Sequence, residues 1–423
     1  MSMIYDVIIV GGGTAGCACA YIAGQKGLKV LLIEKNSYLG GSITSSLVIP
    51  AMKSSDNSIN TTFYSELYRR LVKINGAITY KDGNIGWINP ELTKITLDDM
   101  MRDSNVDIIF EAYAKEINKI LSGYSVTICS YNMNEKIFYQ DSKLLSPIET
   151  KYLVDATGNA EICKMLNCEF LETDSDYQPV NLRFIMSGID INKFSKWLLE
   201  YDKDANVTTS TCIDGNTYLS TAYTWDTSTN WALRPVFESA IKDKVITEED
   251  SNYFQIFSVA GTPDSIAFNC PRVLNYKQTK SEAYISARAS ILRLSRFCKD
   301  YLPGFKNSYI SSIAPNLGIR VSNRVKGKYV YTINDLKSGK KFKSPVVISN
   351  YPIDIHSQHK NSSKLEKVYK EYQLPIESLI INDNLFVIGR CISAESDALA
   401  ALRIIPSCFS MGEGLANYLA ISK

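Results

Sequence analysis

Three glycines and one carboxylate near the start of the chain have the spacing of a dinucleotide-binding motif. Gly11, Gly13 and Gly16 follow the apolar run 7–10, and Glu34 closes a second apolar run roughly 20 residues further on. Glycine at these positions permits a tight turn, a close approach of backbone N–H groups to a pyrophosphate, and close packing of a helix on a sheet. A carboxylate such as Glu34 accepts hydrogen bonds from ribose hydroxyls and repels the 2′-phosphate of NADP. The spacing therefore predicts a site for FAD or NAD.

The elements that must position these residues form one strand–helix–strand unit. We expect strands over residues 7–10 and 30–33, and a helix from Thr14 to about Lys26. The start of the helix, Thr14 and Ala15, offers unpaired N–H groups and the positive end of the helix dipole to phosphate oxygens. A chance glycine-rich turn does not require strand, turn, helix, strand and acid in this order. The unit therefore favours a nucleotide site.

Composition and charge narrow the class of protein. The chain has 423 residues, of which 45% are hydrophobic and 21% charged, which is typical of a folded protein with room for two domains. Its formal net charge of +2 gives no whole-chain attraction to nucleic acid or to an anionic membrane. No run of 18 or more apolar residues occurs, and the start lacks the layout of a signal peptide. We expect a cytoplasmic protein with no nucleic acid and no membrane among its partners.

The cysteines and histidines argue against a metal centre. Ten cysteines are scattered along the chain with no C-x-x-C pair, and there are two histidines, His356 and His359. This usage disfavours a zinc site, a cysteine-ligated iron–sulfur cluster and a C-x-x-C redox disulfide. We expect no metal, and cysteines that are mostly reduced and buried. Cys391 and Cys408 leave open a reactive thiolate, although a buried structural thiol is the favoured interpretation.

Two glycine-containing segments outside the motif favour FAD over NAD. Gly40-Gly41, followed by Ser42, leaves backbone room beside an extended diphosphate–ribitol chain. Near the C-terminus, a strand over 385–388 stops at Gly389-Arg390 and leads into a helix over about 403–421. The chain therefore returns to the first unit at its end.

The middle of the first half adds a third such feature. Extended segments over 124–130, 136–140 and 150–154 predict an antiparallel meander. The meander leads into the turn Asp155-Ala156-Thr157-Gly158, where a second strand–helix unit would stand in an NAD-binding domain. Helices are expected over 61–75 and 193–201. A hairpin is expected from strands 326–333 and 341–348, which flank a turn-rich stretch.

Several blocks of the chain resemble the glutathione-reductase-type FAD-binding fold, and more closely an FAD-dependent oxidoreductase family with xanthan-lyase-like and fumarate-reductase-like flavoproteins. The blocks are VGGGTAGCACA (10–20), LGGSITSSLVIP (39–50), VDATGNAEI (154–162), QPVNLRFIMSGID (178–190), FNCPRV (268–273), GIRVSNRVKGKYVYT (318–332), YPIDIH (351–356) and the C-terminal stretch 384–420. The resemblance implies an α/β fold, in which a Rossmann-type FAD-binding domain carries a parallel sheet plus a β-meander. A second α+β substrate domain would be built on a mainly antiparallel sheet.

The resemblance also implies a domain division and a set of cofactor contacts. Residues 1–170 and 306–423 would form the discontinuous FAD-binding domain, and 171–305 the substrate domain. No histidine lies near Gly40-Gly41, so the FAD is expected to be non-covalent. The residues expected to contact it are Gly11, Gly13, Thr14, Ala15, Gly16, Glu34, Lys35, Gly40, Gly41, Ser42, Ala114, Ala156, Thr157, Gly158, Gly389 and Arg390.

Candidate catalytic residues come from the second half of the chain. His356 is the best candidate for proton transfer near neutral pH, the alternative being a packed loop histidine. His359 lies in a polar run and is expected to be solvated. Arg320 and Arg324, with Arg272, could hold a substrate carboxylate or negative charge on the reduced flavin, and an ion pair between domains is the alternative.

These features predict an FAD-dependent oxidoreductase, a dehydrogenase or reductase that transfers hydride between a small organic molecule and FAD. Its electron donor or acceptor is unidentified, with oxygen, a quinone, a ferredoxin and a nicotinamide all open. The alternatives are an FAD enzyme acting on a carrier-bound or macromolecular substrate such as tRNA, and a non-enzymatic redox sensor. The oligomeric state is also open, a homodimer included.

Overall fold

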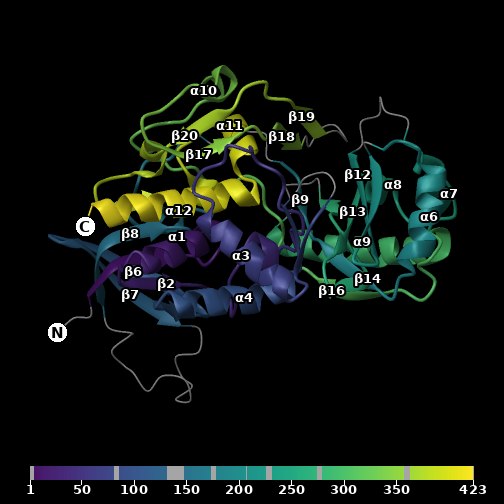
Figure 1. Cartoon of the computed structure of the whole chain (residues 1–423), viewed down its shortest axis with the longest axis horizontal. Helices are drawn as coiled ribbons and strands as arrows, with labels where there is room; N and C mark the ends of the chain where they lie inside the picture. Colours follow the sequence, from purple (N-terminus) through teal and green to yellow (C-terminus); the bar gives the residue numbers. More distant parts are fainter. Residues whose placement is uncertain are drawn as a thin grey trace, which may run out of the picture.

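Two large sheets, with helices and small two-stranded sheets around them, make up the computed structural model (Figure 1). The structure describes residues 4–80, 85–130, 147–172, 178–205, 207–224, 231–273, 279–356 and 363–422. Both predicted parts of the α/β fold are present in it, a mainly parallel sheet with a meander and a separate antiparallel sheet.

The first sheet carries the N-terminal motif. Within the described residues it has seven strands, and its centre is parallel because β1 and β2 are apolar runs covered on both faces. The meander strands pair antiparallel at one side. The strand order is β5 (Val106–Ile109), β2 (Val30–Ile33), β1 (Ile4–Val10), β8 (Ile148–Asp155), β7 (Gly123–Ser130) and β6 (Ala112–Ile120), with β21 (Leu385–Val387) parallel to β8.

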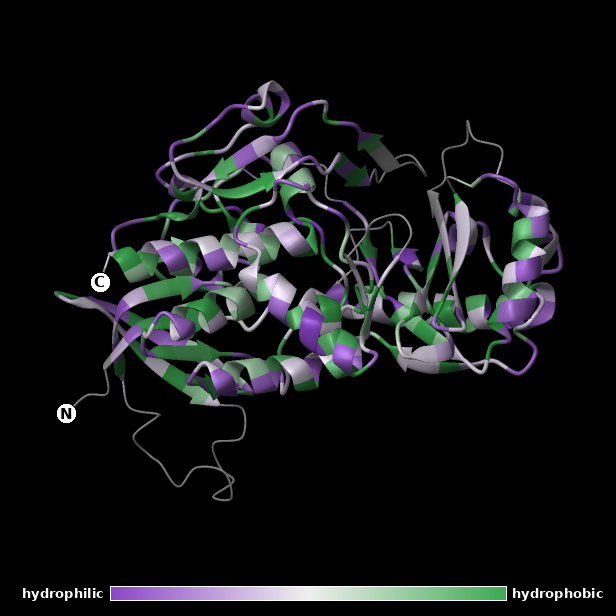
Figure 2. Ribbon diagram, viewed as in Figure 1, coloured by the Kyte–Doolittle hydropathy of each residue, from purple (hydrophilic) through white to green (hydrophobic). Residues whose placement is uncertain are grey.

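Two helices from opposite ends of the chain lie side by side next to this sheet (Figure 1). They are α1 (Thr14–Gln25) and α12 (Ile405–Ile421). A Cβ on Gly412 of α12 would lie 2.1 Å from the carbonyl oxygen of Ala15, so the two backbones touch. Figure 2 shows the strands of the sheet largely in the hydrophobic colour, consistent with this buried layer.

Two more helices pack beside this pair, one against both α1 and α12 and the other against α1 and the first of the two. They are α3 (Thr62–Lys73) and α4 (Pro90–Asp103). Glu413, buried on α12, accepts a hydrogen bond from the backbone N–H of Phe63 (2.9 Å) in the first turn of α3. Asn89 caps α4 by accepting from Glu91 N–H and Leu92 N–H.

The second sheet is antiparallel and has six strands within the described residues. Its core is aromatic, with the rings of Phe184 and Phe268 stacked 4.4 Å apart. The strand order is β11 (Thr208–Ile213), β12 (Asn216–Thr224), β13 (Tyr253–Val259), β14 (Thr262–Phe268), β10 (Phe184–Ser187) and β16 (Tyr309–Ile313). Its helices are α6 (Ile191–Tyr201), α7 (Arg234–Lys242), α8 (Glu248–Ser251) and α9 (Lys280–Tyr301).

Short paired strands and short helices complete the fold. The paired ones are β3 (Ala77–Thr79) with β4 (Ile85–Ile88), β9 (Val180–Asn181) with β15 (Arg272–Val273), β17 (Pro345–Ser349) with β20 (Tyr372–Pro375), and β18 (Ile353–His356) with β19 (Ser363–Glu366). The short helices are α2 (Ser42–Ser45), α5 (Glu161–Met165), α10 (Ile333–Ser338) and α11 (Ser396–Leu402), with 3₁₀ turns η2 (Ile376–Leu379) and η3 (Gly389–Cys391).

The predicted hairpin over 326–333 and 341–348 is wrong. The stretch expected to be its turn forms α10 instead, because Thr332 and Asp335 make a reciprocal capping box at its start and Gly339 ends it in the left-handed conformation. The real partner of β17 is β20, later in the chain.

Most other predicted elements are confirmed. The first strand–helix–strand unit, the meander strands β7 and β8, and helices α3 and α6 lie where they were expected. The predicted segment 136–140 lies outside the described residues. The C-terminal helix begins at Ile405, and a separate helix, α11, precedes it.

The predicted domain boundary at 305/306 excludes a strand of the second sheet. β16 pairs antiparallel with β10, so it belongs with the substrate-side sheet. The division into two domains stays a prediction, with its second boundary moved beyond Ile313.

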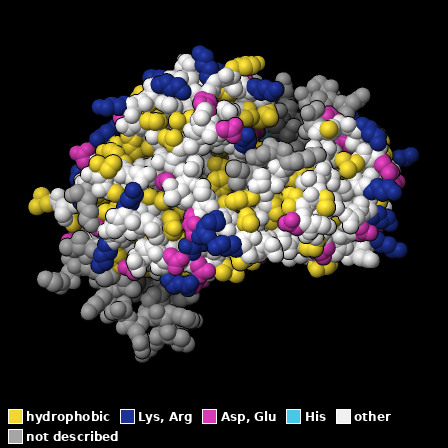
Figure 3. Space-filling view, in the orientation of Figure 1, with side chains coloured by type: hydrophobic (Ala, Val, Ile, Leu, Met, Phe, Trp, Pro, Cys, Tyr) yellow, Lys and Arg dark blue, Asp and Glu magenta, His cyan; other side chains and the backbone are white. Residues whose placement is uncertain are grey.

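The outer surface mixes side chains of all kinds. On the face shown in Figure 3, basic, acidic and hydrophobic side chains are interspersed. No helix in the described part of the chain is long and apolar enough to cross a membrane.

The contact between α1 and α12 gives a stability prediction. Gly412→Ala places a methyl group against the Ala15 carbonyl, so the helices must separate, and we expect a loss of about 1–3 kcal/mol. The measurement is the melting temperature of the cofactor-free protein.

Gly13→Ala is the matched control for this substitution. Gly13 has φ −76°, which alanine adopts freely, and its Cβ would meet nothing nearer than Gly41 Cα at 4.0 Å. Its melt should match that of the unchanged protein. Equal melts for Gly412→Ala and Gly13→Ala would contradict the packing argument.

Candidate cofactor and substrate site

One cavity joins the two sheets. It has a volume of about 880 Å³ and extends from the carboxyl ends of β1, β2 and β8 to a wall that includes β13 and β14. Ligands of α/β sheets bind at this edge of the parallel strands. The volume lies toward the upper end of the range for ligand pockets, so an extended cofactor and a small molecule can share it.

The glycine turn at the end of β1 is shaped by backbone contacts. Gly11 N–H donates to the Ile33 carbonyl (2.8 Å), and Gly11 has φ +110° with Ala156 O only 2.4 Å from where a Cβ would stand. Only glycine fits there. At Gly13 the space in front of the backbone is instead open to the cavity, at the N-terminus of α1. Unpaired N–H groups and open space at a helix N-terminus are what a pyrophosphate requires.

Glu34 lies at the end of β2, beside the glycine turn. We use the name cradle for the part of the cavity formed by the turn at Gly11–Gly13, by Glu34 and by the turn after β8. Glu34 is 6% exposed, and its carboxylate accepts hydrogen bonds from Gly12 N–H (2.7 Å) and Asn36 N–H (2.8 Å). Burial raises the pKa of this carboxyl, while the hydrogen bonds from Asn36 and Gly12 oppose the rise. Glu34 therefore orders the two loops in addition to facing the expected ribose.

The turn after β8 forms the third side of the cradle. Buried Asp155 accepts from Thr157 N–H (3.1 Å), the Thr157 hydroxyl (2.7 Å) and Cys163 N–H (3.0 Å), which holds the turn and the start of α5 together. Arg390, from the C-terminal return, donates to the Gly158 carbonyl (3.2 Å) and to Asn159 Oδ1 (3.0 Å). The turn after the meander and the C-terminal return thus meet at the cavity.

Most of the predicted cofactor residues line the cavity. They are Gly11, Gly13, Thr14, Ala15, Glu34, Lys35, Gly41, Ser42, Ala114, Ala156, Thr157, Gly158, Gly389 and Arg390. Gly16 and Gly40 lie behind it. A Cβ on Gly16 would stand 1.9 Å from Gly11 O, so Gly16 serves helix packing, and Gly40 N–H donates to the Gly12 carbonyl (2.9 Å).

His356 lies in the opposite wall, at the end of β18. It is 5% exposed, and its Nδ1 is 2.8 Å from a guanidinium nitrogen of Arg272 while its Nε2 is 3.3 Å from Asp354 Oδ1. A guanidinium can only donate, so Nδ1 accepts and Nε2 carries the hydrogen. Burial, and then the charge of Arg320, lower the His356 pKa from 6.5 to about 3, against the opposing effect of Asp354. The ring is therefore neutral and held at both nitrogens, which favours a positioning role over the predicted acid–base role.

The two predicted arginines separate in the structure. Arg320 lines the cavity and donates to Pro179 O and Asn181 Oδ1 (both 2.6 Å). Arg324 does not line it. Arg324 is 3% exposed and donates to the carbonyls of Ala394 (3.2 Å) and Glu172 (2.7 Å), so the geometry favours a structural role for it.

The cavity is also lined by residues that were not singled out as site residues from the sequence, and six polar ones on the substrate side matter most. They are Arg183, Tyr253, Gln255, Asn269, Asp354 and Arg403. Tyr253 donates to Gln255 Oε1 (2.9 Å) and accepts from Asn269 Nδ2 (3.2 Å), and Arg272 stacks on the Tyr253 ring (4.4 Å to the centroid). Arg183, Asn269, Asp354 and Arg403 stand inside blocks that carry the family resemblance, and this is the signal that could have found them.

The cysteines near the cavity are structural thiols. Cys408 lines it, and burial raises the pKa of its thiol to about 11, so the group is protonated at neutral pH. Burial also raises the pKa of Cys391. The favoured interpretation of both residues, a buried thiol, agrees with this environment, and all ten cysteines are free of disulfides.

The family of FAD dependent oxidoreductases matches residues 6–423, so the chain belongs to this family. It is an FAD-dependent enzyme. The cradle of this structure fits the cofactor, because the space a Cβ at Gly13 would enter is open and lies at a helix N-terminus. The residues that would hold FAD are those of the cradle around Gly11, Glu34, Gly41, Thr157 and Arg390.

Matches to individual curated proteins are short. A cinnamate reductase from Clostridium sporogenes is 43% identical over 77 residues, 18% of this chain and 11% of that protein. A ferredoxin–NADP reductase from Lysinibacillus sphaericus is 51% identical over 43 residues, 10% of this chain and 12% of that protein. The chain thus spans about a tenth of the length of these relatives.

Solved structures match over nearly the whole chain at low identity. A glycine oxidase from Geobacillus kaustophilus gives a TM-score of 0.46 at 11% identity, covering 100% of this chain and 96% of that one. A p-nitrophenol 4-monooxygenase from Pseudomonas putida gives a TM-score of 0.49 at 10% identity, covering 100% of this chain and 80% of that one.

The cradle gives a prediction for cofactor binding. Glu34→Ala removes the expected ribose contacts and releases the two loops, so FAD should bind about 30- to 1,000-fold more weakly, for a loss of about 2–4 kcal/mol. Gly13→Val should be worse, because it fills the open space. The measurement is fluorescence titration of the cofactor-free protein with FAD. Affinities equal to that of the unchanged protein in both variants would remove this site from FAD binding.

The environment of His356 gives a pH prediction. With a folded pKa of about 3, the unfolded chain binds a proton below pH 6.5 that the folded chain does not, so stability present above pH 6.5 is lost as the pH falls. His356→Gln should therefore lose less melting temperature than the unchanged protein between about pH 7 and pH 5.

The control for the pH experiment is the other histidine. His359 lies outside the described residues and is expected from the sequence to be solvated, so His359→Gln should keep the slope of the unchanged protein. A slope that is the same in His356→Gln and in the unchanged protein would show that His356 titrates normally.

Proposed function

We propose that this enzyme is a dehydrogenase or reductase that exchanges a hydride between FAD and a small organic molecule. The observation that carries the proposal is one continuous cavity, which has a dinucleotide cradle at one end and a polar wall from the second sheet at the other. When bound, FAD supplies the two-electron chemistry. The side chains of this chain supply binding, orientation and electrostatics.

The polar wall is arranged to orient a substrate. Tyr253, Gln255 and Asn269 hydrogen-bond to one another, so their side chains are fixed before a ligand arrives. Asn181 Nδ2 donates to Asn269 Oδ1 (3.0 Å), which fixes the amide from behind. The Arg272–His356–Asp354 chain supports the same wall. Fixed polar groups beside a cofactor favour a small molecule held in one orientation.

The two alternative functions each make a specific demand on the protein. A carrier-bound or macromolecular substrate requires the reacting group to enter this cavity on a flexible arm. A redox sensor requires the flavin to change state without repeated turnover. Oxygen, a quinone, a ferredoxin and a nicotinamide all stay open as the electron partner.

Anaerobic rapid mixing tests the proposal. The FAD-loaded protein is mixed with panels of hydroxy acids, amino acids and alcohols, and the dithionite-reduced protein with panels of enoates, ketones and imines, while flavin absorbance is followed. We expect one class to change the flavin redox state at a rate that saturates with concentration. A further panel with an artificial electron acceptor must then give repeated turnover, and its absence would favour the sensor.

The role of His356 follows from the same assay. Because its ring is neutral and engaged at both nitrogens, His356→Gln should lower the rate of flavin reduction or reoxidation by less than about 10-fold. FAD content and melting temperature at neutral pH are measured alongside. A fall of about 10²–10⁴-fold in a fully flavin-loaded variant would restore the acid–base role.

A further inference from the structure

Three arginines from distant parts of the chain meet in the substrate-side wall of the cavity. Arg183 precedes β10, Arg320 follows β16, and Arg403 joins α11 to α12, and all three line the cavity. Arg403 donates to the backbone carbonyl of Arg320 (2.9 Å). The charge of Arg320 acts on both Arg183 and Arg403. We name these three residues the arginine cluster.

The hydrogen-bond partners of the cluster are neutral. Arg183 donates to the carbonyl of Ser46 (3.3 Å), and Arg403 donates to the Gln178 side-chain oxygen (2.9 Å) and to the backbone carbonyl of Asp354 (2.7 Å). Arg320 likewise uses a carbonyl and an amide oxygen. In the described part of the chain, no carboxylate oxygen lies within 4.0 Å of a guanidinium nitrogen of these three residues.

The positive charge of the cluster is therefore only partly balanced. Asp354 is the acidic residue on this wall of the cavity. Its carboxylate lies 3.3 Å from His356 and also interacts electrostatically with Arg403 and Arg320, so one carboxylate faces three guanidinium groups. Burial, and then the charge of Arg320, lower the pKa of Arg183 to about 9. Burial also lowers the pKa of Arg403, to about 10, although Asp354 opposes this shift. An anion placed between buried like charges reduces the repulsion between them.

The phosphates of FAD do not account for this charge. The pyrophosphate belongs at Gly13 and the start of α1. Arg390 stands between the two ends of the cavity, because it donates both to the Gly158 carbonyl and to the carbonyl of Ile319, the residue before Arg320. The partners of the arginine cluster come from other segments, Ser46, 178–181, Arg320 and Asp354. The cluster thus stands on the wall where a second ligand would lie.

We propose that the arginine cluster binds an oxyanion group, a carboxylate or a phosphate, of the molecule that exchanges electrons with FAD. This inference rests on the proposed function and names its substrate class as a small organic anion. The planar guanidinium fork matches both oxyanions through paired N–H···O bonds. Tyr253, Gln255 and Asn269 then orient the uncharged part of the same molecule.

Anion titration of the FAD-loaded protein tests the inference without a known substrate. Acetate, malonate and inorganic phosphate are added at constant ionic strength while the visible flavin spectrum is recorded, with acetamide as the neutral counterpart of acetate. We expect a saturable spectral change with the anions and none with acetamide. Tighter binding of the carboxylates than of phosphate assigns the carboxylate, and the reverse order assigns the phosphate.

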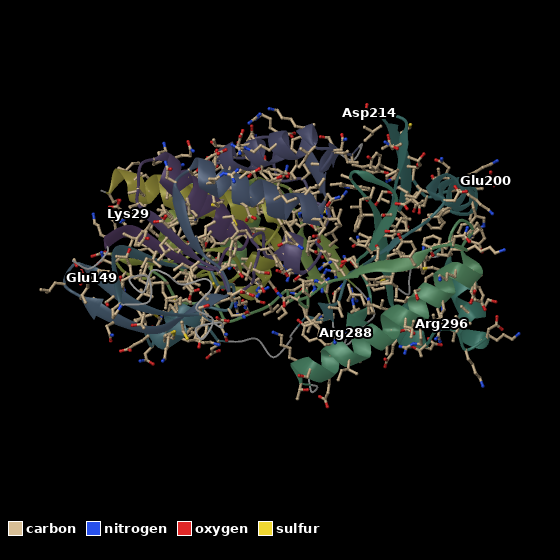
Figure 4. The ribbon with its side chains drawn as sticks, turned by 90° about the horizontal axis from the view of Figure 1, so that it is seen from below. Lys29, Glu149, Glu200, Asp214, Arg288 and Arg296 are labelled. Carbon is tan, nitrogen blue, oxygen red and sulfur yellow. The ribbon has the colours of Figure 1, made fainter. Side chains whose placement is uncertain are left out.

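Charge-removing variants locate the effect. Arg183→Gln and Arg320→Gln should each weaken anion binding by about 10- to 100-fold, since each removes charge-assisted hydrogen bonds. Arg183→Lys keeps the positive charge but loses the planar guanidinium fork, so its anion affinity should lie between those of the unchanged protein and of Arg183→Gln. Arg296→Gln is the matched control, because Arg296 is exposed on the outer face of α9 (Figure 4) and its loss changes the net charge equally.

FAD content and melting temperature are measured first, to show that each variant is folded and loaded with cofactor. Two positions of the cluster are substituted, so that the test still stands if one variant fails to fold. The inference is overturned if no anion gives a saturable change, if acetamide binds as tightly as acetate, or if both glutamine variants match Arg296→Gln. Rapid turnover of a neutral substrate would overturn the anion site and leave the proposed function standing. Anion binding without turnover of any substrate would leave the anion site standing and overturn the proposed function.

Discussion

The backbone contacts of α1 are the constraint on which the site depends. Gly16 lets α1 approach the turn at Gly11, and Gly412 lets α12 press against Ala15 from the other side. Together they fix the N-terminus of α1 at the end of the sheet, where its unpaired N–H groups face the cavity. The helix α12, close to the C-terminus, thus holds in place a cradle whose glycine motif lies close to the N-terminus. The cofactor site needs both ends of the chain.

The elements that the sequence predicted well are those set by local chemistry. The glycines at 11, 13 and 16 and the apolar runs beside them leave few other conformations, so β1, α1 and β2 follow directly. The hairpin failed because its expected turn carries a stronger local signal, the Thr332–Asp335 capping box. The true pairing of β17 with β20 joins segments separated by other elements, and no local pattern encodes it.

The candidate site divides in the same way. Its cofactor half follows from spacing along one stretch of chain, and most of the expected contacts line the cavity. Its substrate half is assembled from Arg183, Tyr253, Asp354 and Arg403, which come close only when the second sheet and the C-terminal segments meet. His356 shows the limit most clearly. Residue type alone suggests a group that titrates near neutrality, but burial and two arginines keep its ring neutral.

The charge distribution of the cavity separates the tasks of its two ends. At the cradle, a helix N-terminus offers positive potential to a pyrophosphate, while Glu34 offers acceptors to a ribose. At the far wall the cluster of Arg183, Arg320 and Arg403 exceeds the single carboxylate of Asp354, which His356 already engages. Burying such an excess destabilises the protein on its own. In this wall Tyr253, Gln255 and Asn269 hydrogen-bond to one another and leave the excess charge of the arginines uncompensated, so an anion that arrives with the substrate best explains it.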